Sequence, residues 1–150
     1  MTIPDDDVNR LRTAIGRISR TLERQSGGAG MTRTELSVLG AVARAKSLAM
    51  SALADLEGNN PTMLSRVVGR LEASGLVVRV PAPTDRRAVI VEITPEGARV
   101  HARLRKQRTR LLTEWLADLS AAEVQALVGA LPALETLAAH NRRPAARVAR

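Results

Sequence analysis

The feature that most constrains this chain is the order of sequence patterns between residues 48 and 97. A short helical pattern at 51–57 is followed, after a tight turn, by a second one from Pro61 to about Ser74. Two runs rich in β-branched residues then come at 76–80 and 88–93. Because a turn-like stretch separates these runs, the pattern predicts helix, turn, helix and then a β-hairpin.

Start and stop signals support both helices. Gly58 is placed to end the first helix, and Asn60 to cap the second. Pro61 then occupies the first helical position, where its missing N–H does no harm. We expect one face of each helix to be buried, with Leu53, Ala54 and Leu56 on the first and Leu64, Val67, Val68 and Leu71 on the second.

The opposite side of the second helix is small, polar and basic. It carries Thr62, Ser65, Arg66 and Gly69, with Arg70 near one edge. Small side chains let a backbone approach the floor of a DNA groove, and Arg66 is long enough to reach guanine O6 and N7 or a phosphate. Arg70 suits a phosphate or a nearby carboxylate. Taken alone, this helix is explained equally well as an ordinary solvated face.

The tip of the hairpin favours the DNA interpretation. It carries Asp85, Arg86 and Arg87 directly after the basic helix. We expect Asp85 to pair with one arginine and stiffen the tip, while the other arginine enters the minor groove or meets a phosphate. Charged hairpin tips are common, but two adjacent arginines beside a basic helix face are less so. The order of elements is that of a winged helix-turn-helix.

Amphipathic helical patterns flank this unit. A helix from about residue 5 presents Val8, Leu11, Ile15, Ile18 and Leu22 on one face. Thr32 and Glu35 form a capping box for a helix that fades near residues 45–47 and buries Leu36, Leu39 and Val42. After the hairpin, residues 94–97 start a long helix with the apolar stripe Val100, Leu104, Leu111 and Trp115. We expect most of its basic residues to face water.

A terminal helix completes the chain. Ser120 and Glu123 form its capping box, and Pro132 predicts a kink or a break inside it. Its apolar positions are Val124, Leu127, Leu131, Leu134 and Leu137. The winged unit has enough apolar residues for its own core, so the apolar faces at both ends call for a second copy of the chain.

We therefore expect one domain, mainly α with a small β-wing. Residues of about 31–97 form the DNA-binding unit, and about 5–30 and 98–140 form a two-fold dimerisation region, followed by a basic tail at 141–150. The two recognition helices of such a dimer should lie about 34 Å apart, or a multiple of it, to match a palindromic site. A length of 150 residues suits one domain better than two.

Composition narrows the function further. Lys and Arg number 23 against 15 for Asp and Glu, and the formal net charge of +8 favours an anionic partner. There is no cysteine, and residues 1–7 are acidic and polar where a signal peptide would be basic and then apolar. We expect a cytoplasmic protein with no cofactor. His101 and His140 are too isolated for a metal site and read as surface residues.

Other classes fit less well. The chain lacks a nucleophile with its base, paired carboxylates and a phosphate loop, so an enzyme is not expected. Single-strand or RNA binding relies on stacking aromatic residues, and Trp115 is the only aromatic residue here. The remaining alternative is an architectural or co-regulatory protein that binds DNA mainly through charge, without a small-molecule ligand.

The segments PTMLSRVVGRLEASG at 61–75, LVVRV and DRRAVIVEITPEG at 85–97 resemble the MarR family of bacterial winged-helix regulators. The resemblance covers nearly the whole chain. It implies a homodimer that represses or activates genes and is released from DNA by a small phenolic acid or similar aromatic anion. The family's groove-reading positions correspond to Thr62, Ser65 and Arg66, and its paired wing residues to Asp85 and Arg87, with Arg86 beside them.

The chain also departs from the family pattern. Asn59 and Asn60 stand where an apolar and a small hydroxyl residue are more usual, and the lack of cysteine excludes oxidation sensing through a thiol. Phe and Tyr are absent. Any pocket for an aromatic ligand would therefore be built from aliphatic residues and arginines, and the sequence assigns none of them.

Overall fold

The structure is a computed structural model that describes residues 3–26, 30–58, 60–85 and 87–140. Asn59, Arg86 and the basic tail at 141–150 lie outside the described residues. The described residues form six helices and three strands, which follow the expected order except for the additional strand β1: α1 (Asp5–Gln25), α2 (Arg33–Ala45), β1 (Ser47–Ala49), α3 (Met50–Glu57), α4 (Pro61–Ala73), β2 (Val77–Pro81), β3 (Val89–Ile93), α5 (Pro95–Ala117) and α6 (Ala121–His140).

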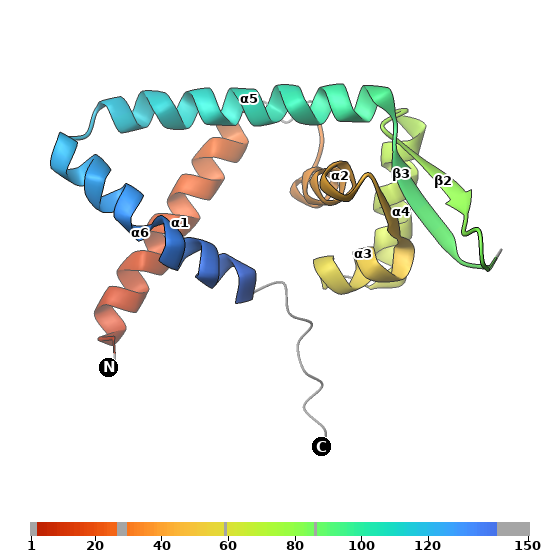
Figure 1. Ribbon diagram of the computed structural model, residues 1–150, viewed down its shortest axis with the longest axis horizontal. Helices are drawn as coiled ribbons and strands as arrows, with labels where there is room; N and C mark the ends of the chain where they lie inside the picture. The colour runs from red at the N-terminus through yellow and green to blue at the C-terminus, as the bar shows by residue number, and fades with distance from the viewer. Residues whose placement is uncertain (1–2, 27–29, 59, 86, 141–150) are drawn as a thin grey trace, which may run out of the picture.

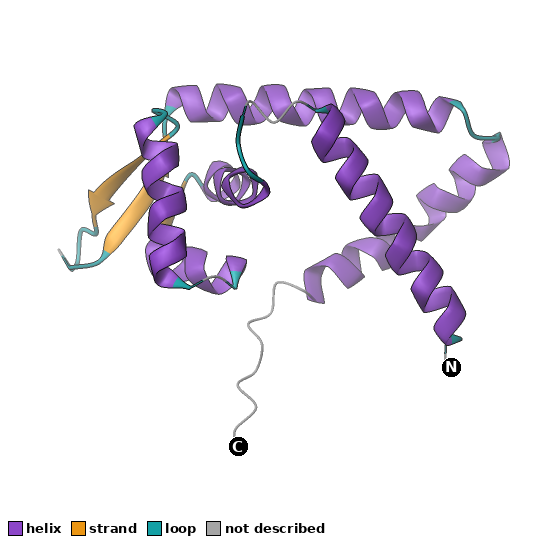
Figure 2. Cartoon of the chain, turned by 180° about the vertical axis from the view of Figure 1, so that it is seen from behind, coloured by secondary structure: helices purple, strands orange, loops and turns teal. Residues whose placement is uncertain are grey.

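The elements form two regions joined by α5. Figure 1 shows α5 as a long rod, with α2, α3, α4 and the hairpin gathered at its N-terminal end and α6 turning back from its C-terminal end. We call residues 31–104 the winged lobe, and α1 with α6 the terminal helices. In Figure 2 α1 extends away from the winged lobe, whereas α6 runs from the far end of α5 back toward it. None of the described helices has the length and apolar composition needed to cross a membrane.

The hydrophobic core lies wholly inside the winged lobe. Its buried side chains come from α2, α3, α4, the hairpin and the first turns of α5: Val38, Leu39, Ala41, Val42, Leu53, Leu64, Val67, Val68, Leu71, Leu76, Val77, Val91, Val100 and Leu104. The four apolar positions expected to face inward from α4 are all buried. The prediction that Leu56 is buried is wrong. Leu56 is exposed on α3, and only Leu53 of that helix is buried.

A small antiparallel sheet with the strand order β1-β3-β2 supports the wing. The hairpin pairs Val77 with Ile93 and Pro81 with Val89, so β2 runs one residue into the stretch expected to be a turn. Strand β1 was not expected from the sequence. It pairs Leu48 with Val91 and fixes the hairpin to the segment between α2 and α3.

Local capping signals set the helix boundaries. Thr32 and Glu35 form the expected capping box, and Ser120 and Glu123 form another, with their side chains and backbone amides paired at 2.7–3.3 Å. Thr94 Oγ1 accepts a hydrogen bond from the Gly97 amide at 2.9 Å and starts α5. Helix α6 continues through Pro132, so the break considered at this residue does not occur.

Candidate nucleic-acid interface

Helix α4 presents the expected polar and basic side to solvent. Thr62, Ser65 and Arg66 are exposed, and the opposite face is buried in the core. Asn60 Oδ1 accepts a hydrogen bond from the Thr62 amide at 2.8 Å, and Gly58 ends α3 in the left-handed region with φ of 60°. These caps fix where α4 begins and hence which side chains point outward. No described terminal helix covers this side (Figures 1 and 2).

Arg70 pairs with a nearby carboxylate, one of the two partners expected for it. Its Nε lies 2.7 Å from Glu35 Oε1 on α2. The Glu35 side chain is only 8% exposed, whereas that of Arg70 is 63% exposed. The other Glu35 oxygen accepts the Thr32 amide, so one carboxylate caps α2 and also holds α4. Much of the guanidinium of Arg70 still faces solvent at the edge of the α4 surface.

Gly69 does not lie open to solvent, although the sequence pattern places it on the side of α4 that approaches a DNA groove. It is half-buried, and a Cβ placed on it would lie 3.7 Å from a guanidinium nitrogen of Arg79. Arg79 extends from β2 across α4 to reach the main chain of Ser65. Sequence reasoning missed this residue, for which the only signal was a single basic side chain inside an apolar β-rich run.

The wing tip is ordered by Asp85 through the backbone. Its Oδ1 accepts a hydrogen bond from the Arg87 amide at 2.9 Å, and its carbonyl oxygen accepts one from the Ala88 amide at 2.9 Å. Asp85 therefore stiffens the tip by forming a turn with Arg87, instead of the expected pairing with the guanidinium of that residue. The Arg87 side chain is exposed. The alternative pairing, with Arg86, lies outside the described residues.

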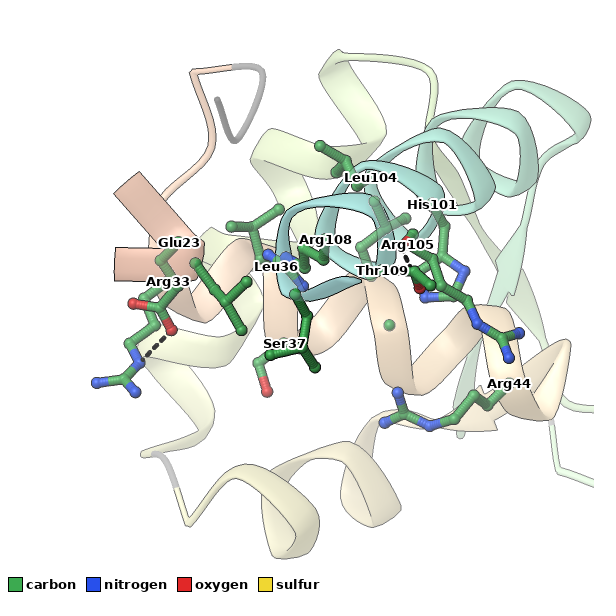
Figure 3. Close-up of a pocket in the computed structure, with 14 residues that line it drawn as sticks. Glu23, Arg33, Leu36, Ser37, Arg44, His101, Leu104, Arg105, Arg108 and Thr109 are labelled. Atoms are coloured by element: carbon green, nitrogen blue, oxygen red, sulfur yellow. Dashed lines mark hydrogen bonds and ion pairs between the residues drawn. The ribbon is translucent and has the colours of Figure 1, made fainter. Parts of the chain in front are cut away.

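A pocket of about 690 Å³ lies between α1, α2 and α5. Its apolar wall comes from Leu22, Leu36, Leu39, Leu104 and Leu112, and its basic residues are Arg33, Arg44, Arg105 and Arg108. Figure 3 shows Arg33 and its ion-pair partner Glu23 at one end, with Arg44, Arg105 and His101 at the other. Most basic residues of α5 are exposed, as expected, and this includes Arg105 at the edge of the pocket; Arg108 is half-buried in it. Besides these aliphatic residues and arginines, the lining includes Glu23, Ser37, His101 and Thr109.

The prediction that His101 is a surface residue is wrong. It is half-buried in this pocket and not a surface residue. Burial lowers the pKa of its imidazole below 6.5, and the positive charges of Arg44, Arg105 and Arg108 lower it further. The imidazole is therefore neutral at neutral pH. A Cβ placed on Gly40 would lie 3.2 Å from Nη1 of Arg44 and 3.7 Å from Nε2 of His101, so both side chains lie against this glycine.

The terminal helices expose their apolar faces. On α1 the exposed residues are Val8, Leu11, Ile15 and Ile18, and on α6 they are Leu127, Val128, Leu131 and Leu137. Each of these side chains is at least 44% exposed. None of the residues of α1 is buried in the chain itself. These faces match the surplus apolar surface expected from the sequence.

Comparison with known proteins gives consistent matches. Residues 29–88 match the model of the MarR family. An uncharacterised HTH-type transcriptional regulator of Mycobacterium bovis is 33% identical over 113 residues, which cover 75% of this chain and 79% of that protein. A putative transcriptional regulatory protein for the hcr operon of Thauera aromatica is 35% identical over 70% of this chain and 63% of its own length.

The fold is also shared with solved structures. That of the Multiple Antibiotic Resistance Repressor, MarR, superposes with a TM-score of 0.75 at 24% identity, covering 89% of this chain and 96% of that one. The likeness extends over both the winged lobe and the terminal helices. It therefore includes the elements whose apolar faces are exposed in a single copy.

Proposed function

Since this chain belongs to the MarR family and is therefore a DNA-binding transcriptional regulator rather than an enzyme, we propose that two copies act as a repressor on an inverted-repeat operator in the cytoplasm. The observation that carries the proposal is the exposed side of α4, where Thr62, Ser65 and Arg66 lie opposite the buried face of the helix. A repressor role is supported by the name of one structural relative, the Multiple Antibiotic Resistance Repressor.

Two copies are needed because of the terminal helices. We assign residues 5–30 and 98–140 to the dimer interface, and 31–97 to DNA binding. Covering the exposed leucines, isoleucines and valines of α1 and α6 contributes about 25 cal/mol for each Å² of apolar surface removed from water. Two-fold symmetry would then present two α4 helices to successive major-groove faces of the same duplex.

Each candidate side chain has a distinct task. Thr62, Ser65 and Arg66 face base edges in the major groove, where Arg66 is suited to guanine O6 and N7. Arg70, held by Glu35, contacts a phosphate at the edge of the helix. At the wing, Asp85 shapes the turn, while Arg87 and Arg86 reach the minor groove or a phosphate.

The test begins by selecting duplexes that purified protein retains, including the DNA upstream of its own reading frame. We expect Arg66→Ala to reduce binding and relax preference at particular base pairs, at a cost of about 1–3 kcal/mol. Arg87→Ala should weaken binding to all duplexes more evenly and lower the salt slope by about one. Salt titrations of both variants and the parent on selected and scrambled duplexes provide the measurement.

A different outcome would favour the alternative function. If the parent binds selected and scrambled duplexes equally, and loses affinity with salt equally on both, it is a charge-driven architectural or co-regulatory DNA-binding protein. Equal affinity of the parent, Arg66→Ala and Arg87→Ala for the selected duplex would contradict the residue assignments. Sedimentation of a monomer at micromolar concentration would remove the dimer.

We further propose that the pocket between α1, α2 and α5 takes the effector, a small organic anion with an apolar or aromatic body. Its leucines suit the body, and Arg44 suits the anionic group, because no carboxylate partner of Arg44 occurs among the described residues. An anion bound between α1 and the winged lobe would change the position of the two α4 helices relative to the dimer region, and this change would release DNA.

Benzoate and the matched neutral compound benzamide test this pocket. Benzoate should raise the melting temperature of the parent and release the selected duplex, whereas benzamide should do neither. Arg44→Gln should lose the response, and Arg99→Gln, which removes an equal charge outside the pocket, should keep it. Responses that do not differ between the two compounds, or between the two variants, would contradict an anion site here.

A further inference from the structure

Arg79 makes an unusual set of contacts for a residue on a β-strand. Its Nη2 donates to the main-chain oxygen of Ser65 at 2.6 Å and lies 3.4 Å from Ser65 Oγ. Its Nη1 lies 3.2 Å from Glu72 Oε2. The Arg79 amide donates to the other Glu72 oxygen at 3.0 Å. One side chain from the wing thus contacts α4 at two places, seven residues apart.

Space for the guanidinium is provided by Gly69, which lies between these two contact points on α4. A Cβ at this position would lie 3.7 Å from Nη2, so alanine would just touch the guanidinium and a larger side chain would meet it. The half-buried state of Gly69 follows from this cover. Glycine inside a helix costs about 0.8–1 kcal/mol relative to alanine. At position 69 a glycine is favoured because it leaves room for the side chain of Arg79.

We propose that Arg79 is a positioning residue for base recognition, which fixes the wing and the reading face of α4 in one geometry and orients the Ser65 hydroxyl. This inference rests on the proposed function of α4 as the reading helix. Strand β2 leads to the tip that carries Arg87, and α4 carries Thr62, Ser65 and Arg66. Arg79 is therefore a direct link between the two surfaces proposed to meet DNA.

The same contacts define what Ser65 offers to DNA. Nη2 of Arg79 lies 3.4 Å from Ser65 Oγ and takes up one of the two acceptor lone pairs of the hydroxyl, whose proton therefore points elsewhere. This biases Ser65 toward donating to DNA, which favours acceptors such as purine N7, guanine O6 or thymine O4. Without Arg79 this bias is lost.

Arg79 differs from a phosphate-binding arginine. Its positive charge is balanced by Glu72, and its side chain is only 30% exposed. Removing it should therefore change affinity and base preference without removing a phosphate contact. By contrast, loss of a phosphate contact lowers the slope of binding against salt by about one.

The experiment compares four variants on the selected duplex and on duplexes altered at single base pairs. Arg79→Met keeps the length of the side chain and removes its donors, and we expect about tenfold weaker binding, relaxed preference at the base pairs nearest Ser65, and an unchanged salt slope. Arg79→Lys should recover part of the affinity. Glu72→Gln should give a smaller loss in the same direction, and Arg99→Met is the matched control at an exposed site.

A double variant separates positioning from stability. If Arg79 acts through Ser65, Arg79→Met should have little further effect on base preference once Ser65→Ala is present. Melting temperatures identify variants that fail to fold, and Glu72→Gln tests the same link if Arg79→Met is one of them. Parent-like preference in Arg79→Met, or a salt slope lowered by one, overturns the inference. Failure of the parent to select any duplex overturns the proposed function instead.

Discussion

The winged lobe and the terminal helices differ in the exposed fraction of their apolar side chains. Leu53 in the winged lobe is 0% exposed, whereas Val128 on α6 is 59% exposed. Both regions are helical and rich in leucine and valine. The winged lobe brings α2, α3, α4 and the hairpin around a common centre, whereas no further helix or strand of the described residues covers the apolar faces of α1 and α6.

This difference shows that hydrophobic content alone does not define a core. Full burial of a leucine or valine contributes about 1.5–3 kcal/mol, and the exposed apolar residues of α1 and α6 gain only part of this contribution in a single copy. We infer that the stability of the winged lobe is internal, and that of the terminal helices depends on association. Substitutions in the two regions should therefore differ in how their effects depend on protein concentration.

The largest effect is expected from a pair of matched glycine substitutions. A Cβ on Gly97 would lie 2.0 Å from the main-chain oxygen of Leu76, so Gly97→Ala forces α5 away from the hairpin. We expect a loss of about 3 kcal/mol or more in the free energy of unfolding, measured by urea denaturation. A Cβ on Gly129 in α6 meets nothing within 4 Å, and Gly129→Ala should be neutral or stabilising by up to about 1 kcal/mol.

The pair also reports on association. If the partner copy packs closely against Gly129, Gly129→Ala will lower dimer stability at constant stability of the winged lobe. Measurements at two protein concentrations separate these effects, since dimer stability depends on concentration. Equal losses from both substitutions at all concentrations would break the contrast between the two regions.

The second effect concerns α1. Ile15 is 45% exposed in a single copy and lies in the middle of the apolar face, so association buries just under half of it, and Ile15→Asn should weaken the dimer by about 0.7–1.4 kcal/mol for each copy. For the two copies together this corresponds to a rise in Kd of at least about tenfold, measured by sedimentation. Thr13 lies on the opposite side of α1, and Thr13→Asn is the control. A dimer of unchanged strength in Ile15→Asn would place the interface elsewhere.

Elements governed by local chemistry could be predicted from the sequence. Helix starts are located by signals that act within three residues of each other: Thr32 with Glu35, Asn60 with Pro61, and Ser120 with Glu123. The buried face of α4 was equally clear, because its apolar residues recur at helical spacing. The hairpin followed from two β-rich runs around a turn.

Non-local contacts were not visible in the same way. Strand β1 has three residues and exists because Leu48 meets Val91, more than forty positions later. Arg79 reads as an ordinary strand residue until β2 is placed against α4. Leu56 satisfies the helical period but ends on the outer side of a helix of eight residues. The pocket required α1, α2 and α5 together, and so escaped residue-by-residue reasoning.

The smallest effect is expected at His101, in the pocket where the terminal helices meet the winged lobe. Its pKa is lowered in the folded chain, by burial first and then by Arg44, Arg105 and Arg108. As the pH falls through about 6.5, the unfolded chain binds a proton more readily than the folded one, so acidification lowers the free energy of unfolding. This loss levels off below the folded pKa. Urea midpoints at pH 7.5, 6.5 and 5.5 measure it.

His101→Gln provides the comparison, because it keeps a polar side chain and does not titrate. The parent should lose more stability than His101→Gln between pH 7.5 and 5.5, and the difference between the two proteins isolates the contribution of His101. Glu23 also lines this pocket, on α1, and is partnered by Arg33. A bound anion would favour the protonated imidazole, so benzoate should bind the parent more tightly at pH 5.5 than at 7.5, and His101→Gln should lose that dependence. Parallel pH profiles with and without benzoate would mean that His101 does not couple the pocket to either region.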